Sequence, residues 1–161
     1  MDSSNLITFN FISTLIMKTS EEITSHLQLL IEKNNDMHKQ LIEVFALAEN
    51  DATRSFFLKA ADRHRIFSLQ WVGVLKEINA DASFDVEGSF SSALGRAWLD
   101  IKASLQMIND EVLLSAIEDS YEEIKQPYEN LEIRHKKMDF LIQDHIEKIQ
   151  ALEKEIQILK G

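Results

Sequence analysis

Two histidines, His64 and His145, stand among apolar residues at spacings that place them on the inward faces of two helices. Imidazole nitrogens and carboxylate oxygens are ligands that proteins offer to iron, manganese and zinc. Glu118 and Glu122 border the apolar positions of a third segment and add carboxylates to this set. One hypothesis is therefore that these four side chains hold a single iron, manganese or zinc ion.

The two-metal site of ferritin-like proteins is not expected. That site takes a Glu from each of two helices and a Glu-x-x-His pair from each of the other two. Three residues before His64 stands Ala61, and three residues before His145 stands Ile142. Because both glutamates are missing, the chain lacks the bridging carboxylates that two metal ions need.

The sequence favours a second interpretation of the two histidines, which needs no cofactor. Buried polar groups are normally hydrogen-bonded, and a neutral imidazole has one donor and one acceptor. His64 and His145 are then neutral core residues bonded to a neighbour such as Asn34, Ser120 or Tyr121.

Other catalytic patterns are missing from the sequence. There is no cysteine, no glycine-rich phosphate loop and no Gly-x-Ser-x-Gly motif. We therefore expect a protein that is not an enzyme. The net charge of −10 repels nucleic acid and anionic membranes, so neither is an expected partner. No Lys or Arg precedes the apolar run at residues 5–17, as it would in a secretory signal, and we expect a cytoplasmic protein.

Four long helices must position these residues. One proline and four glycines in 161 residues leave few turns, and apolar residues alternate at spacings of three and four. The pattern predicts helices at about 19–49, 52–79, 111–129 and 131–159. A shorter helix is expected at about 90–106, inside a long connection.

The order is a helical hairpin, a long crossover and a second hairpin, which is the connectivity of a ferritin-like, antiparallel four-helix bundle. We expect one all-α domain over residues 19–161. An up-down bundle with a fifth helix and a dimeric coiled coil are the alternatives. Residues 1–18 are expected to be a flexible extension, or a mis-assigned start upstream of Met17. The alternative is a flexible or weakly helical tail docked on the bundle.

The segment from Gly88 to Lys102, with its Gly-Ser start, Arg-x-Trp and Asp-x-Lys, resembles the signature of a bacterial family of ferritin-like four-helix-bundle proteins of unknown function. Asn34-Asn35-Asp36 and Tyr128 also resemble that family. The resemblance covers about residues 20–150. It implies the bundle fold and no established activity, with a stress-associated role suggested by analogy. A non-catalytic protein that contacts other proteins fits it best.

The last predicted helix carries an apolar stripe, Leu152, Ile156 and Leu159, beyond the length that the other helices need. An uncovered apolar stripe is typical of an interface. The sequence therefore predicts a homodimer through this helix, unless the N-terminal segment covers the stripe.

Overall fold

The computed structural model describes residues 3–84, 108–131 and 136–161, and these residues form four helices and no strand. The helices are α1 (Ser3–Leu47), α2 (Asp51–Ile78), α4 (Asp110–Glu129) and α5 (Lys136–Lys160). The all-α class and the helical bundle are therefore confirmed for the described part of the chain. The helix expected at about 90–106 and the segment from Gly88 to Lys102 lie outside the described residues.

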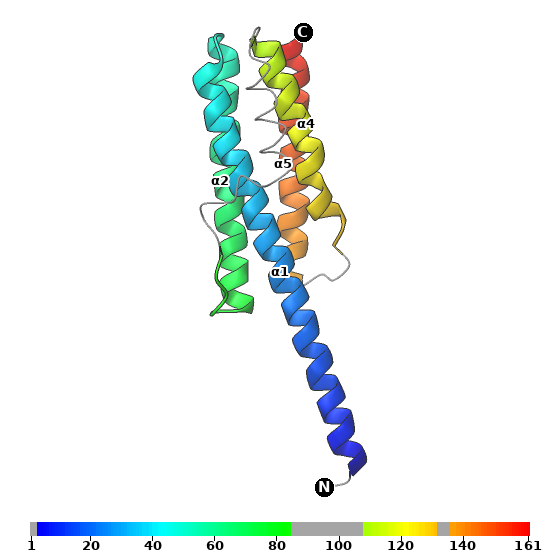
Figure 1. Ribbon diagram of the computed structural model, residues 1–161. Helices are drawn as coiled ribbons and strands as arrows, with labels where there is room; N and C mark the ends of the chain where they lie inside the picture. The colour runs from blue at the N-terminus through cyan, green and yellow to red at the C-terminus, as the bar shows by residue number, and fades with distance from the viewer. Residues whose placement is uncertain (1–2, 85–107, 132–135) are drawn as a thin grey trace.

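The four helices pack around one apolar core (Figure 1). α2 follows α1 after a short turn and runs back along it, and α4 and α5 lie against this pair. Each helix turns toward the core the face on which its apolar residues recur every three or four positions. This row of apolar residues, called the seam of the helix here, is buried as the spacing predicts. Buried members include Leu27, Leu41, Phe57, Trp71, Ile117, Tyr128, Ile149 and Ile156.

Side-chain caps start α2 and α4. The Asn50 side chain accepts a hydrogen bond from the amide of Ala52 (2.8 Å), and the Asn109 side chain accepts one from the amide of Val112 (2.9 Å). Such caps satisfy amides that have no partner inside the helix. They fix the ends of both helices at the same end of the bundle as the α1–α2 turn.

Asp110, in the first turn of α4, ties that helix to the α1–α2 turn. Its two carboxylate oxygens accept hydrogen bonds from the backbone amides of Glu49 (2.8 Å) and Asn50 (2.9 Å). Because each charge-assisted bond contributes about 1 kcal/mol or more, we expect Asp110→Ala to lower the free energy of unfolding by about 2 kcal/mol. Urea unfolding measures this change. Asp119→Ala, on the same helix, is the control, and an equal loss in both variants would contradict the assignment.

α1 begins at Ser3, about sixteen residues before the helix start expected at Thr19. The Thr19 hydroxyl donates to the Leu15 carbonyl (3.0 Å), as a residue inside a helix does. Residues 3–17, called the arm here, extend α1 beyond the bundle instead of docking on it (Figure 1). The assignment of residues 1–18 as an extension outside the domain of residues 19–161 stays a prediction. Eight large apolar arm residues are 49–70% exposed: Leu6, Ile7, Phe9, Phe11, Ile12, Leu15, Ile16 and Met17.

The apolar stripe of α5 is covered within the chain. Leu152 and Ile156 are buried, and the arm leaves the bundle at the end opposite the C-terminus (Figure 1). The apolar residues that suggested a dimer through α5 are therefore not exposed. The dimer through this helix stays a prediction. The helices that the structure describes include none with the length and apolarity needed to cross a membrane.

Candidate functional site

The centre of the bundle holds a group of buried polar side chains contributed by all four helices. Asn34 comes from α1, His64 from α2, Tyr121 and Tyr128 from α4, and His145 from α5, and each is buried. All stand on the apolar seams of their helices, which is why folding carries them inward. Both predicted histidine ligands therefore lie in the core, as the sequence indicated.

Asn34 connects the two halves of this polar network. The side-chain NH₂ group of Asn34 donates to the Leu30 backbone carbonyl (2.8 Å) and to the Tyr128 hydroxyl (2.9 Å). Its carbonyl oxygen lies 2.8 Å from Nδ1 of His64 and can only accept, so His64 carries its proton on Nδ1. Nε2 of His64 then accepts a bond from the Tyr121 hydroxyl (3.3 Å).

Tyr128 and His145 form the other half of the network. The Tyr128 hydroxyl accepts bonds from Asn34 and from the Trp71 indole N–H (3.2 Å), and it lies 3.0 Å from Nδ1 of His145. Nε2 of His145 lies 2.9 Å from the side-chain oxygen (Oε1) of Gln70, which only accepts. His145 therefore carries its proton on Nε2, and Tyr128 donates to Nδ1. The two histidines hold opposite tautomers.

Burial keeps both histidines neutral. Desolvation, with smaller contributions from the nearby His145, His38 and Arg63, lowers the pKa of His64 to about 3. Desolvation also lowers the pKa of His145 to about 3, against a small opposing effect of Asp144. Both imidazoles contact the Phe67 ring: His145 stacks on it at 3.9 Å between centroids, and His64 meets it edge-on at 5.4 Å.

The tyrosines are held neutral by the same cause. Burial raises the pKa of Tyr121, and nearby Glu153 and Glu155 raise it further. Burial also raises the pKa of Tyr128, although the bonds from Trp71 and Asn34 act in the opposite direction. A neutral phenol donates its proton, and each of these two phenols donates to an imidazole nitrogen. Every proton in the network therefore has an acceptor.

The polar network of Asn34, His64, Tyr121, Tyr128 and His145 is called closed here because its ring nitrogens all have partners inside the protein. All four ring nitrogens of His64 and His145 are engaged in hydrogen bonds, so none is left to accept a proton from a substrate or to bind a metal. The bonds to Asn34 and Tyr121 were expected for core histidines and are confirmed for His64. Ser120 instead lies 3.1 Å from Gln40.

The two predicted carboxylate ligands lie elsewhere. Glu118 accepts bonds from Gln157 and Lys160 near the C-terminal end of α5, and the Lys160 bond lowers its pKa. Lys160 is fifteen residues beyond His145, about 22 Å along a helix. Glu122 pairs with Lys125 (2.8 Å), and its side chain is 71% exposed. The structure brings the two histidines together but leaves both glutamates outside.

These side chains do not fit a metal ion in this arrangement. Within residues 3–84, 108–131 and 136–161, no three His, Asp or Glu side chains converge as a metal site requires. We expect purified protein to contain less than about 0.1 metal ion per chain after incubation with iron, manganese or zinc, because the histidine nitrogens are already engaged. Elemental analysis beside His64→Ala/His145→Ala measures this. Near-stoichiometric metal that the double variant loses would restore the metal hypothesis.

Gln70 and Trp71 belong to the network, but the sequence did not point to them. Trp71 stands on the α2 seam, where an aromatic residue packs in the core, and Gln70 lies beside that seam, where a polar residue is usually exposed. The one available signal was the need of His145 for a second partner. The side-chain oxygen of a glutamine is an acceptor that can provide it.

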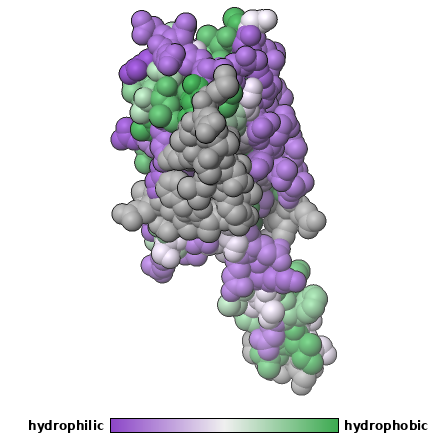
Figure 2. Space-filling model, turned by 45° about the horizontal axis from the view of Figure 1, so that its top comes forward, coloured by the Kyte–Doolittle hydropathy of each residue, from purple (hydrophilic) through white to green (hydrophobic). Residues whose placement is uncertain are grey.

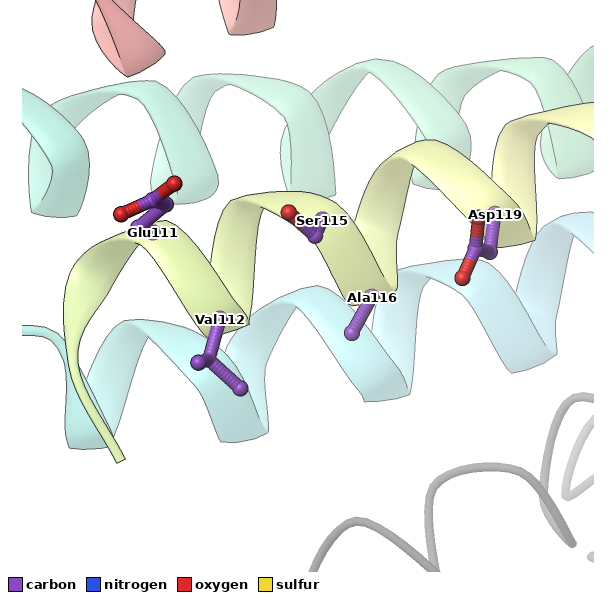
Figure 3. Close-up of a pocket in the computed structure, with 5 residues that line it drawn as sticks. All are labelled: Glu111, Val112, Ser115, Ala116 and Asp119. Carbon is purple, nitrogen blue, oxygen red and sulfur yellow. The ribbon is translucent and has the colours of Figure 1, made fainter. Parts of the chain in front are cut away.

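A shallow hollow lies on the surface of α4 (Figure 3). Its lining residues all come from one face of α4, with Glu111 and Asp119 at its two ends and Val112, Ser115 and Ala116 between them. The carboxylates are eight residues apart, about 12 Å along the helix. They cannot hold one ligand atom together, so the hollow is an open helix surface.

Comparison with known proteins places the chain in a family. The family described as Domain of unknown function (DUF2383) matches residues 22–133, which include all of α2 and α4 and most of α1. No curated protein and no solved structure matches the chain. Because the match covers more than half of the residues, this protein belongs to the DUF2383 family.

Proposed function

We propose that this protein is a non-catalytic helical scaffold that binds another protein through its arm. The observation that carries this proposal is the exposure of the eight large apolar arm residues. A helix that is apolar on all sides is normally buried, and a contiguous exposed apolar surface is typical of an interaction site. Figure 2 shows apolar residues, in green, on the projecting arm, beyond a hydrophilic stretch where it leaves the bundle.

The closed polar network supports the non-catalytic part of the proposal. An active site needs a group with a free lone pair or a transferable proton within reach of a substrate. The four ring nitrogens in the core have hydrogen-bond partners inside the protein. The network instead links α1, α2, α4 and α5 and favours one register among them, a use known for buried polar residues in helical assemblies.

We also propose that the bundle has ferritin-like connectivity. Contacts between neighbouring helices pair the start of one with the end of the other, which supports antiparallel neighbours: Asp110 with Asn50, His26 with Pro127, Lys59 with Glu155, and Glu77 with Lys137. α2 and α4 run in the same direction. His64 contacts Tyr121, and Trp71, seven residues further along α2, contacts Tyr128, seven residues further along α4. Parallel α2 and α4 support a connection that crosses the length of the bundle.

Site-specific photocrosslinking in growing cells tests the interaction. A photoreactive phenylalanine analogue replaces Phe9 in the arm, and a matched sample carries it at Phe140, which is 76% exposed on α5. We expect discrete protein adducts from position 9 and none of comparable yield from position 140. Absence of any protein adduct from position 9 would contradict the proposed function.

A further inference from the structure

The arm continues the core seam of α1 beyond the bundle. Ile23, Leu30 and Met37 are buried and recur every seven residues. Phe9 and Ile16 stand fourteen and seven residues before Ile23, so they extend the same seam. A seven-residue apolar repeat is the pattern by which one helix packs along another. In the bundle α2 and α4 cover this seam, whereas Phe9 and Ile16 are 67% and 63% exposed.

We propose that a second copy of this chain covers the arm, and that the two arms pair antiparallel about a two-fold axis. This inference rests on the proposed function and names its partner. An identical arm presents the same seam at the same length, which a two-fold contact between identical surfaces requires.

Charge selects the antiparallel direction. Residues 3–17 contain no charged side chain, whereas the whole chain carries a net charge of −10. Parallel arms would bring two acidic bundles together. Antiparallel arms that place Phe9 opposite Ile16 hold residue 18 of the two copies about 16 Å apart along the helices, about two screening lengths at physiological salt. The neutral arms are thus the surface on which two copies meet with least repulsion.

Charge also disfavours a lipid surface as the occupant. Helices that lie on membranes carry a polar face rich in Lys and Arg, which attracts anionic headgroups. The arm has no such residue, and the acidic bundle beside it is repelled by an anionic leaflet. A second copy therefore fits the arm better than a membrane does.

Sedimentation velocity on the full chain tests the proposal with two matched double variants. Phe9→Ser/Ile16→Ser removes the seam residues of the arm, and Phe140→Ser/Ile158→Ser removes two residues of the same types that are 76% and 78% exposed on α5. We expect a dimer whose Kd rises at least tenfold in the arm variant and stays unchanged in the α5 variant. Circular dichroism checks that both variants keep their helices.

The chain contains no cysteine, so single introduced cysteines report the direction of pairing. Antiparallel arms centred between Phe9 and Ile16 place Ser13 near its own copy and keep Leu6 far from its copy. We expect Ser13→Cys to form disulfide-linked dimers under mild oxidation and Leu6→Cys to form few. Equal linkage at both positions would overturn the antiparallel arrangement.

Three outcomes would overturn the inference altogether. They are a monomer at all concentrations, a dimer that survives Phe9→Ser/Ile16→Ser, and co-sedimentation of a monomeric chain with phosphatidylcholine–phosphatidylglycerol vesicles. Crosslinks from position 9 separate this failure from that of the proposed function. Adducts to a different protein would keep the proposed function and remove the second copy as the partner, whereas no protein adduct would remove both.

Discussion

Acidification from pH 7.5 to pH 5.0 is expected to lower the free energy of unfolding by about 4 kcal/mol, about 2 kcal/mol from each core histidine. The pKa of His64 and of His145 is about 3 in the folded protein and about 6.5 when unfolded. Between these values the unfolded state binds more protons, so stability falls as the pH falls. The loss begins near pH 6.5 and continues toward pH 3.

Urea unfolding at pH 7.5, 6.5, 5.5 and 5.0 measures this loss. The series stops at pH 5.0 because carboxylates begin to titrate below it. His64→Gln keeps a hydrogen-bonding side chain but removes one titrating group, and it is expected to halve the pH-dependent loss. A loss that is the same in His64→Gln and the unmodified chain would show that His64 is not held neutral by the fold.

Asn34→Ala is expected to lower the free energy of unfolding by about 3 kcal/mol at pH 7.5. The change leaves the Nδ1 proton of His64 without an acceptor and removes one donor to Tyr128. A buried polar group that loses its partner costs about 1–3 kcal/mol, and the missing side chain also leaves a small cavity. Guanidinium unfolding followed by circular dichroism measures the change.

Asn35→Ala is the matched control, because the same substitution one residue along falls on a half-buried position outside the network. We expect it to change stability by no more than about 0.5 kcal/mol. The double variant Asn34→Leu/His64→Leu removes both partners of one bond and is expected to be more stable than Asn34→Ala. Equal losses from Asn34→Ala and Asn35→Ala would show that the network carries no stability.

The helices and the inward position of the histidines could be predicted because apolar periodicity extends over many turns. Asn34, His64 and His145 each occupy a seam position, and folding buries whatever the seam carries. The bonds of His64 to Asn34 and Tyr121 followed from the need of a buried imidazole for partners. The family match supports a family of unknown function, as the crossover segment suggested.

The positions of Glu118, Glu122 and Gln70 could not be predicted in this way. All three lie at the edges of seams, where a small rotation decides whether a side chain faces the core or solvent. Glu118 instead pairs with Lys160 across the end of the bundle, a contact that depends on where α5 ends. The start of α1 was also missed, since an exposed apolar run gives no capping signal for a helix boundary.

The most direct test of the closed network is the nitrogen-15 spectrum of the two imidazole rings, recorded through their long-range couplings to ring protons. With His64→Gln and His145→Gln to assign the signals, we expect His64 to be protonated on Nδ1 only and His145 on Nε2 only, both unchanged from pH 7.5 to pH 5.0. The same tautomer in both rings, exchange between tautomers, or protonation of either ring above pH 5.0 would contradict the network and reopen the core as a chemical site.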